Sequence, residues 1–333
     1  MHRIKATGGI IALLTAFQGF LWGETTDAVR IAPFRGDHVA AVSYTFDDGL
    51  RDQFTIALPI LDELRIPATF YIIPGAVADT KEAAEAKKPG AFGGVTWDEL
   101  RAVSARGYEI GNHTWNHLNL TQLDAPHIED EIDQADARIE KEIGIFPVSV
   151  AFPANASNPD IKAIALSHHS VIRDFQTGMG KKDVTVDRVN AWIDDLIKQK
   201  KWGVAMIHGI VQGFDPFDPA VLKAHLTYAK SKENDLWIDT FANVGRYVKE
   251  RTVSTIQIVS QADKSVAFVL SRPPLTPNFI VPLTLIISAP GAISAEAHRN
   301  GVISSLPVKI VPDAVQIEAT PGPEAIIVTW KNG

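Results

Sequence analysis

A pair of adjacent carboxylates is the first feature of this sequence that could do chemistry. Asp47 and Asp48 end an apolar run over residues 40–46 and are followed by Gly49. Because neighbouring residues of an extended chain point in opposite directions, one carboxylate can hold a metal ion while the other faces a substrate. If both faced one dry pocket, their repulsion would raise the pKa of one of them strongly. Taken alone, the pattern also fits a solvated turn that closes a hairpin.

A pair of histidines is the second such feature. His113 and His117 are four residues apart, and on a helical turn this spacing places both imidazoles on one side, where they can share a metal ion. Surface histidines, or histidines satisfied in the core, give the same pattern. Here the pair follows a predicted strand, as the two aspartates do. Together they supply three nitrogen and oxygen ligands with one position open, which is typical of catalytic zinc.

A further histidine follows another apolar run. His208 comes directly after residues 203–207, where burial of its ring would be costly unless it met a cavity or a partner. A core histidine bonded to the backbone is the alternative interpretation. At the carboxyl end of a barrel strand, such a residue is a natural general acid.

These residues need a sheet that brings strand ends together. From Val39 to about Glu250, strand-like and helix-like segments alternate, which predicts a parallel sheet, either open or closed into a barrel. In both, functional groups collect at the carboxyl ends of the strands. Residues 78–94 are expected to form a solvated insertion or lid, and Thr96 with Glu99 predicts a capping box. The expected strands are 39–46, 68–73, 108–110, 148–152, 170–173 and 203–207, and the expected helices are 53–64, 96–106, 125–143, 159–166, 189–200, 219–229 and 240–248.

The pattern changes after about Thr252. Short alternating segments separated by Pro, Gly and Asn predict a small antiparallel β-sandwich over 253–333. It could bind a polymer or pack against the first domain, and without an exposed aromatic row packing is favoured. The expected strands are 255–259, 265–271, 280–287, 308–311, 315–319 and 325–330.

Composition narrows the class of protein. The chain has 333 residues, 46% of them apolar and 21% charged, which describes a globular protein with two domains. The net charge of −7, without a local basic stripe, argues against a nucleic-acid partner. The absence of Cys excludes disulfides and lipoprotein attachment.

The first residues have the order of a secretory signal. Arg3 and Lys5 precede an uncharged apolar run over 8–22 and then Gly23, which predicts a signal peptide over 1–23 and export to the periplasm or the medium. The run is short for a membrane span, and no later run could cross a bilayer, so no transmembrane segment is expected once the signal is removed. An anchoring N-terminal helix is the alternative.

Three stretches resemble motifs of the polysaccharide deacetylase family, the NodB-homology enzymes of carbohydrate esterase family 4. Residues 45–49, residues 113–117 and the pair Ile207 and His208 are similar to the family's first, second and fifth motifs. The resemblance covers roughly residues 39–250 and implies a distorted (β/α) barrel over the domain 24–252. It also implies removal of N- or O-acetyl groups from sugars with a divalent metal ion, usually zinc.

The resemblance further implies a role for each motif residue. Asp47 would be the general base that takes a proton from water, and His208 the general acid that donates one to the departing sugar amine. The metal ion and the backbone amide of Ala154 would stabilise the oxyanion. The metal ligands would be Asp48, His113 and His117.

Two parts of the sequence depart from the family pattern. The third motif usually reads Arg-x-Pro-Tyr, but residues 151–154 read Ala-Phe-Pro-Ala, so the Arg that would fix Asp47 is missing. Arg173 or Arg188 could replace it from another strand. In the fourth motif an Asp near a Trp supports the acid histidine. The candidates here are Asp187, Asn190 and Asp194.

The predicted function is therefore hydrolysis of acetyl amide or ester bonds, not peptide bonds, in an acetylated carbohydrate by an exported zinc enzyme. Two alternatives stay open, a metal-dependent esterase or amidase for a non-sugar acyl substrate, and a carbohydrate-binding protein on a deacetylase scaffold. The presence of three ligands, a base and an acid argues against the last, because a binding protein needs none of them.

Overall fold

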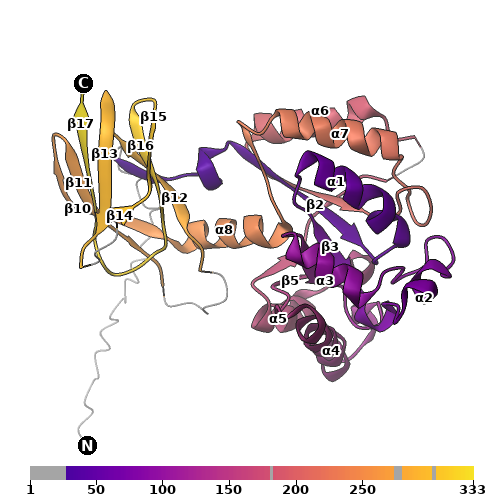
Figure 1. Ribbon diagram of the computed structural model, residues 1–333. Helices are drawn as coiled ribbons and strands as arrows, with labels where there is room; N and C mark the ends of the chain where they lie inside the picture. Colours follow the sequence, from indigo (N-terminus) through magenta and orange to yellow (C-terminus); the bar gives the residue numbers. More distant parts are fainter. Residues whose placement is uncertain (1–27, 181–182, 274–279, 302–304) are drawn as a thin grey trace, which may run out of the picture.

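A curled parallel sheet forms the centre of the first domain and confirms the predicted barrel-like α/β fold (Figure 1). The computed structural model describes residues 28–180, 183–273, 280–301 and 305–333, so the predicted signal peptide lies outside the described residues. The strand order is β6-β5-β4-β3-β2-β8-β7, with β9 also paired to β2, and every pair is parallel. The strands are β2 (Ala40–Asp47), β3 (Thr69–Ile72), β4 (Glu109–Asn112), β5 (Ser149–Ala151), β6 (Val171–Arg173), β7 (Thr177–Gly178), β8 (Trp202–Ile207) and β9 (Leu236–Ile238).

Helices follow the strands close to the positions that the sequence predicts, and the short helix α2 lies in the segment that was expected to be an insertion or lid. Thr96 and Glu99 form the expected capping box, and a π-helical turn at Gln53–Ala57 precedes a helix with Pro59 in its first turn. Within the described ranges, no helix combines the length and the apolar character needed to cross a membrane. The helices are α1 (Leu58–Leu64), α2 (Lys81–Glu85), α3 (Trp97–Ala105), α4 (Ala125–Ile143), α5 (Pro159–His168), α6 (Val186–Gln199), α7 (Pro219–Ser231) and α8 (Phe241–Val253).

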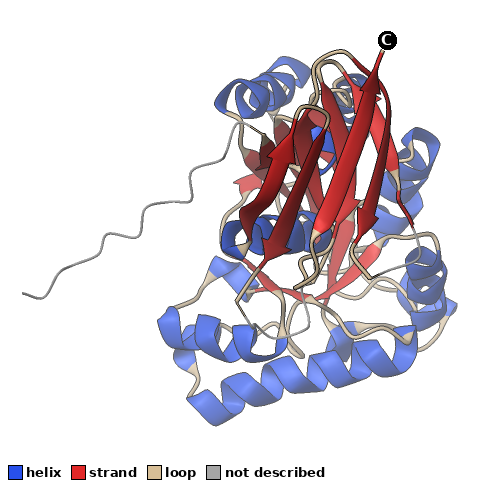
Figure 2. Ribbon diagram, turned by 90° about the vertical axis from the view of Figure 1, so that its left-hand side faces the viewer, coloured by secondary structure: helices blue, strands red, loops and turns tan. Residues whose placement is uncertain are grey.

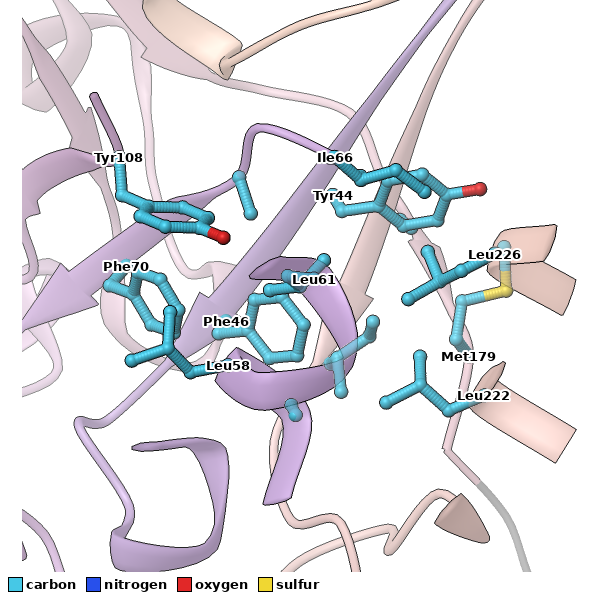
Figure 3. Packing of buried hydrophobic residues seen from close by; sticks show 14 of the residues in the cluster. Tyr44, Phe46, Leu58, Leu61, Ile66, Phe70, Tyr108, Met179, Leu222 and Leu226 are labelled. Carbon is cyan, nitrogen blue, oxygen red and sulfur yellow. The ribbon is translucent and has the colours of Figure 1, made fainter. Parts of the chain in front are cut away.

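Apolar packing between α1 and the sheet fixes the strand that ends in the two aspartates. The ring of Phe46 on β2 stacks on Phe70 of β3 with centroids 5.1 Å apart, and both rings are fully buried. Leu58 and Leu61 of α1 belong to the same cluster (Figure 3). Burying a side chain of this size contributes about 1.5 to 3 kcal/mol, so β2 is anchored directly before its acidic end.

The predicted sandwich consists of two antiparallel sheets, which face the viewer in Figure 2. One has the order β1-β12-β16-β15 and the other β10-β11-β17-β13-β14. The strands are β1 (Val29–Ile31), β10 (Thr255–Ala262), β11 (Ser265–Ser271), β12 (Leu283–Ser288), β13 (Ala292–Arg299), β14 (Ser305–Leu306), β15 (Val308–Val311), β16 (Ala314–Ala319) and β17 (Ile326–Asn332).

One short strand near the N-terminus departs from the predicted division of the chain at residue 253. Strand β1 lies in the range predicted for the first domain, yet Val29 pairs with Ile287 of β12. This strand has no clear signal in the sequence, because three residues are too few for a visible alternation of apolar and polar residues. Residues 29–31 therefore belong to the sandwich.

Helix α8 connects the sandwich to the barrel (Figure 1). Val244 and Tyr247 of α8 share one apolar cluster with strands of the sandwich, and the same cluster includes Ala41 at the beginning of β2. Asp47 lies six residues further along this strand, about 20 Å away at 3.3 Å per residue. The sandwich thus packs against the end of the barrel opposite to the two aspartates.

Candidate active site

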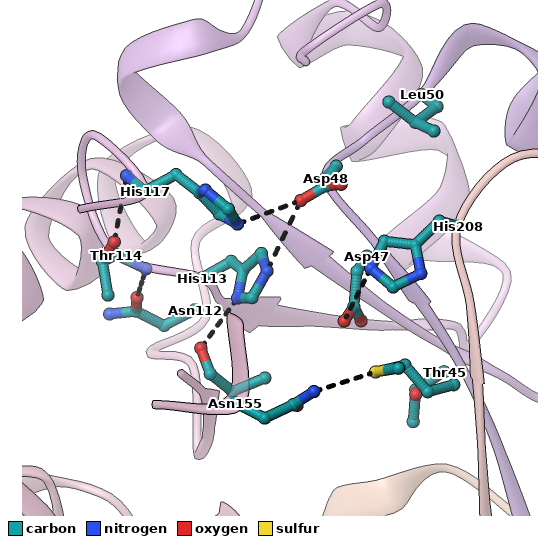
Figure 4. A network of polar contacts seen from close by, with 12 residues as sticks. Thr45, Asp47, Asp48, Leu50, Asn112, His113, Thr114, His117, Asn155 and His208 are labelled. Atoms are coloured by element: carbon teal, nitrogen blue, oxygen red, sulfur yellow. Dashed lines mark hydrogen bonds and ion pairs between the residues drawn. The ribbon is translucent and has the colours of Figure 1, made fainter. Parts of the chain in front are cut away.

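Asp47 and Asp48 diverge at the carboxyl end of β2. Asp47 is the last residue of this wholly buried strand, and Asp48 adopts a left-handed conformation with a φ of 76°. Gly49, with a φ of 64°, continues the turn. As a result Asp47 points toward His208, whereas Asp48 points toward the loop that carries the other two histidines (Figure 4).

The three predicted metal ligands surround one point. Oδ1 of Asp48 lies 3.5 Å from Nε2 of His113 and 3.4 Å from Nε2 of His117. A tetrahedral ion with bonds of about 2.0 to 2.2 Å holds its ligands about 3.3 to 3.6 Å apart. Oδ1 of Asp48 is buried and has no hydrogen-bond partner among the described residues, which is costly unless a cation lies beside it. The cluster therefore fits a divalent metal ion.

The environment of each imidazole suits it to bind a metal. Nδ1 of His113 lies 2.7 Å from the carbonyl oxygen of Ala151, which only accepts, so Nδ1 carries the proton and the lone pair of Nε2 is left able to bind a metal ion. Burial, reinforced by the neighbouring His113, lowers the pKa of His117. This favours the neutral ring, which is the form that binds metal ions.

The two histidines lie on a loop, so the predicted helical turn is wrong. After β4 ends, Thr114 and His117 adopt left-handed conformations with φ of 64° and 59°. The amide of Thr114 donates to Oδ1 of Asn112 at 2.6 Å, and the amide of His117 donates to Oγ1 of Thr114 at 3.1 Å. These bonds to side chains replace the backbone bonds of a helix and still bring both rings together.

A buried carboxylate on α4 supports this loop. Nδ2 of Asn112 donates to Oδ1 of Asp136 at 2.6 Å, and the same oxygen lies 2.9 Å from Nε2 of His169. Nδ1 of His169 faces the carbonyl oxygen of Ala165 at 2.9 Å. Asp136 and His169 are 4% and 3% exposed. We did not predict either residue, because an Asp inside an acidic helix reads as a surface position until the helix is placed on the sheet.

Arg173 holds the carboxylate of Asp47. Its two terminal nitrogens donate to Oδ1 and Oδ2 at 2.6 and 2.5 Å, and one of them also donates to Oγ1 of Thr45 at 2.9 Å. Both members of the ion pair are buried. Arg188, the other residue considered for this role, is exposed on the first turn of α6. A forked arginine of this kind fixes the plane of the carboxylate.

The position of Arg173 explains how the sequence manages without the arginine of the third motif. Ala151 occupies the position where the family usually has that arginine, and it is the register partner of Arg173 on the neighbouring strand β6. Burial by itself would raise the pKa of Asp47, but the charge and hydrogen bonds of Arg173, helped by His113 and His208, lower it to about 2. Asp47 is therefore ionised at neutral pH.

His208 directly follows β8 and shares the site with Asp47. Its Nε2 lies 3.9 Å from Oδ2 of Asp47, and 15% of its side chain is exposed. Gln53 joins the two strand ends, because its Nε2 donates to the carbonyl oxygens of Asp47 and His208 at 2.5 and 2.9 Å. Gln53 was missed from the sequence, where its closeness to the two aspartates was the one available indication.

None of the three residues predicted to support His208 as the acid of the fourth motif contacts it, so this prediction is wrong. Two of them contact other side chains and the third faces solvent. Asn190 lies 3.3 Å from Nδ1 of His225, and Asp194 accepts a hydrogen bond from Tyr228 at 2.7 Å. Asp187 is exposed in the first turn of α6. Asn190 and Asp194 thus contact side chains of helix α7 instead of His208.

Ala154 lies at the same edge of the sheet as the metal ligands. It belongs to the short turn Pro153–Asn155 after β5, where its φ is 53° and its surface is exposed. Nδ2 of Asn155 in this turn lies 3.7 Å from the sulfur of Met206 on β8 (Figure 4). The turn thus crosses between the strand that supports His113 and the strand that leads to His208.

Residues 36–170 match the family model described as polysaccharide deacetylase. This region, less than half of the chain, is similar to the polysaccharide deacetylase family. The matched residues include both aspartates and both histidines of the metal cluster. Arg173 and His208 lie beyond them, so their position beside Asp47 is known from the structure alone.

Several known deacetylases are similar to parts of this chain. A chitooligosaccharide deacetylase of Rhizobium leguminosarum bv. trifolii is 27% identical over 166 residues, which cover 49% of this chain and 69% of the relative. Another, of Sinorhizobium fredii, is 30% identical over 114 residues, or 34% of this chain and 46% of the relative. The solved structure of the peptidoglycan deacetylase PdaC from Bacillus subtilis superposes with a TM-score of 0.43 at 19% identity, over 64% of this chain and 93% of that one.

Proposed function

We propose that this protein is a polysaccharide deacetylase, a metal-dependent hydrolase that removes N- or O-linked acetyl groups from a carbohydrate polymer or oligomer. The observation that carries the proposal is the convergence of three metal-binding side chains with Asp47 and His208 at one edge of the sheet. Two relatives named as chitooligosaccharide deacetylases support a sugar substrate.

Zinc is the ion that best suits the proposed ligands. Asp48, His113 and His117 offer one carboxylate and two imidazoles, a donor set that zinc accepts in catalytic sites. When bound, such an ion lowers the pKa of a coordinated water to about 7 and polarises the carbonyl group of the substrate.

Asp47 and His208 divide the proton transfers in this proposal. Asp47 accepts a proton from the attacking water, while Arg173 fixes the orientation of its carboxylate. His208 donates a proton to the departing amine or alcohol of the sugar, and the backbone amide of Ala154 donates to the oxyanion. A bond forms between the water oxygen and the acetyl carbon, the bond from this carbon to the sugar breaks, and the products are acetate and a free amino or hydroxyl group.

Export is a second part of the proposal. The charge and apolar run of residues 1–23 support a secretory signal. Mass spectrometry of the protein recovered from the periplasm or the medium tests it. A mature N-terminus near residue 24 is the expected result, and full-length protein retained in the cell would contradict export.

Release of acetate is the direct test of the hydrolase. Zinc-loaded wild type, Asp47→Asn and the exposed-residue control Asp133→Asn are incubated with a panel of N- and O-acetylated glycans and with simple aryl acetates. We expect release from glycans by wild type and Asp133→Asn but not by Asp47→Asn. Release of acetate from aryl acetates alone favours a non-sugar acyl substrate. If the zinc-loaded protein releases acetate from none of these compounds, the proposed hydrolase activity is wrong.

A further inference from the structure

Large apolar side chains are exposed around the proposed reaction centre. Phe92 is 40%, Leu118 43%, Val211 51% and Phe214 65% exposed. Leu118 follows the second histidine ligand directly, and Val211 and Phe214 lie in the loop after β8. Apolar surface left in water beside a functional site is typical of a surface that a ligand covers.

Phe92 stands on the metal side of the site. The centroid of its ring lies 4.8 Å from that of His117, with an angle of 51° between the planes. Nζ of Lys87 donates to the carbonyl oxygens of Ala76 and Phe92 at 2.6 and 2.7 Å, and the amide after Phe92 donates to the carbonyl oxygen of Asp48 at 3.0 Å. The ring is therefore held in place although much of it faces solvent.

Phe214 stands on the side of the proposed acid. The centroid of its ring lies 5.1 Å from that of His208, with an angle of 83° between the planes. The loop before it is fixed by Asp52, whose Oδ2 accepts the amides of residues 210–212 at 2.9, 3.0 and 3.2 Å. The amide of Gly209 also donates to the carbonyl oxygen of Phe214 at 3.3 Å.

The two loops touch each other at a pair of glycines. A Cβ atom on Gly90 would lie 2.4 Å from Cα of Gly213, which is too close for two atoms that are not bonded, so no side chain fits at this position. Both glycines have a positive φ, 76° and 93°. Each loop thus braces the other and holds one aromatic ring against one of the histidines on either side of the site.

We propose that Phe92 and Phe214 are the two walls of a sugar-binding subsite and stack against the apolar C–H faces of the substrate's pyranose rings. The inference rests on the proposed function and names the substrate form. Aromatic faces supply large contact area with few rotatable bonds, so they bind a ring with little entropic loss. Because one ring lies beside His117 and the other beside His208, a chain of sugars that passes the reaction centre can contact both, so the subsite favours an oligosaccharide over a single sugar.

The test measures the dependence on chain length. Zinc-loaded wild type, Phe92→Ala and Phe214→Ala are assayed with N-acetylated chitotetraose and with N-acetylglucosamine. Phe175→Ala is the matched control, since Phe175 is 47% exposed and packs on Trp202, which begins β8 and lies about 17 Å from the other end of this strand. Each wall variant should raise the KM for chitotetraose at least tenfold and reduce the preference for the tetramer. Phe92→Tyr and Phe214→Tyr should restore both, and the control should stay within twofold of wild type.

Calorimetry on the zinc-loaded Asp47→Asn protein separates this inference from the proposed hydrolysis. Chitotetraose should bind this protein, and adding Phe92→Ala or Phe214→Ala should weaken binding at least tenfold. If the alanine variants bind chitotetraose more weakly but the wild type does not hydrolyse it, the result contradicts the proposed hydrolase activity and supports the sugar-binding role of the two rings. If both alanine variants keep the wild-type KM, length preference and affinity, the proposed role of the two rings is wrong and the proposed hydrolase activity is unaffected. If the Asp47→Asn protein does not bind chitotetraose at all, both proposals are wrong.

Discussion

Arg173 and Asp47 form a buried, two-pronged ion pair although their strands, β6 and β2, lie four places apart in the sheet. Such a contact requires the sheet to curl so that the ends of β6 and β2 face each other across its inner side. The register supplies the rest, since Arg173 stands beside Ala151 at the same level of the sheet. A missing arginine on one strand is thus replaced from the next.

Removing this arginine should damage both stability and turnover. Arg173→Ala leaves a buried carboxylate without its partner, so we expect a loss of about 3 to 5 kcal/mol in the free energy of unfolding. Loss of an oriented Asp47 should lower kcat at least about 100-fold. Urea unfolding and acetate release measure the two effects.

The control is Arg188→Ala, which removes an exposed arginine and should change stability by less than about 0.5 kcal/mol. The double variant Ala151→Arg, Arg173→Ala returns the guanidinium to its usual place in the family and should recover part of the lost turnover. Equal damage from both single variants would contradict the role given to Arg173.

Metal binding should separate the two neighbouring aspartates. Asp48→Ala should remove the bound metal and all turnover, because it deletes a ligand, whereas Asp47→Asn should retain metal and lose turnover. Zinc content after dialysis, measured by mass spectrometry, together with acetate release distinguishes them. Equal loss of zinc in both variants would show that the roles of the carboxylates are misassigned.

The carboxylate of Asp136 should matter for metal affinity although it touches no ligand. Asp136→Ala frees Asn112 and leaves His169 without its partner, so the ligand loop loses its support. We expect a 10- to 100-fold rise in the Kd for zinc, the range typical of residues that orient ligands. Competition with a zinc-binding dye measures it.

Asp133→Ala on the same helix provides a matched comparison. Asp133 lies 3.9 Å from Nε2 of His168, and both side chains are about half exposed. Its removal should leave the Kd for zinc within twofold of wild type. A similar loss of affinity in both variants would mean that the charge of α4, and not the contact with Asn112, sets the affinity.

His225 should make the fold sensitive to mild acid. It is fully buried against Tyr44, whose hydroxyl lies 3.1 Å from Nε2, and burial lowers the pKa of His225 to about 4. The unfolded chain takes up this proton below about pH 6.5 and the folded protein only near pH 4, so stability is complete above pH 6.5 and falls as the pH drops. The difference between the pKa of His225 in the unfolded and folded states corresponds to about 3 kcal/mol in the free energy of unfolding.

Urea unfolding of the metal-free protein between pH 7 and pH 4 measures this loss without interference from metal release. His225→Gln has no group that titrates there and should show a flatter profile. An unchanged slope in this variant would assign the acid sensitivity to other groups.

The sequence predicts the parts of the site that depend on local pattern. It does not predict the contacts that depend on the register between neighbouring strands. Asp48, His113 and His117 could be grouped because each follows a strand of the same parallel sheet. Arg173 could not be chosen over Arg188, since the level of β6 against β5 is not written in the sequence. Support for His208 was misplaced for the same reason, because the direction of a helical face depends on packing.

The fold itself was largely predictable because the α/β part alternates long periodic segments. Helix α4, for example, has the predicted limits, with Asp124 as its N-cap and Gly144 after its end. Strand β13 was missed, since Ala292–Arg299 contains three alanines, a glutamate and few β-branched residues.

The pairing of β1 with β12 has a consequence for the order in which the chain folds. Val29 emerges from the ribosome long before Ile287, its partner, and the whole deacetylase barrel is made between them. The barrel's parallel strands can pair as they appear, and a folded barrel shortens the effective loop that must close to join the two. The strand synthesised first is therefore among the last to be paired, and a chain interrupted after α8 leaves it without a sheet.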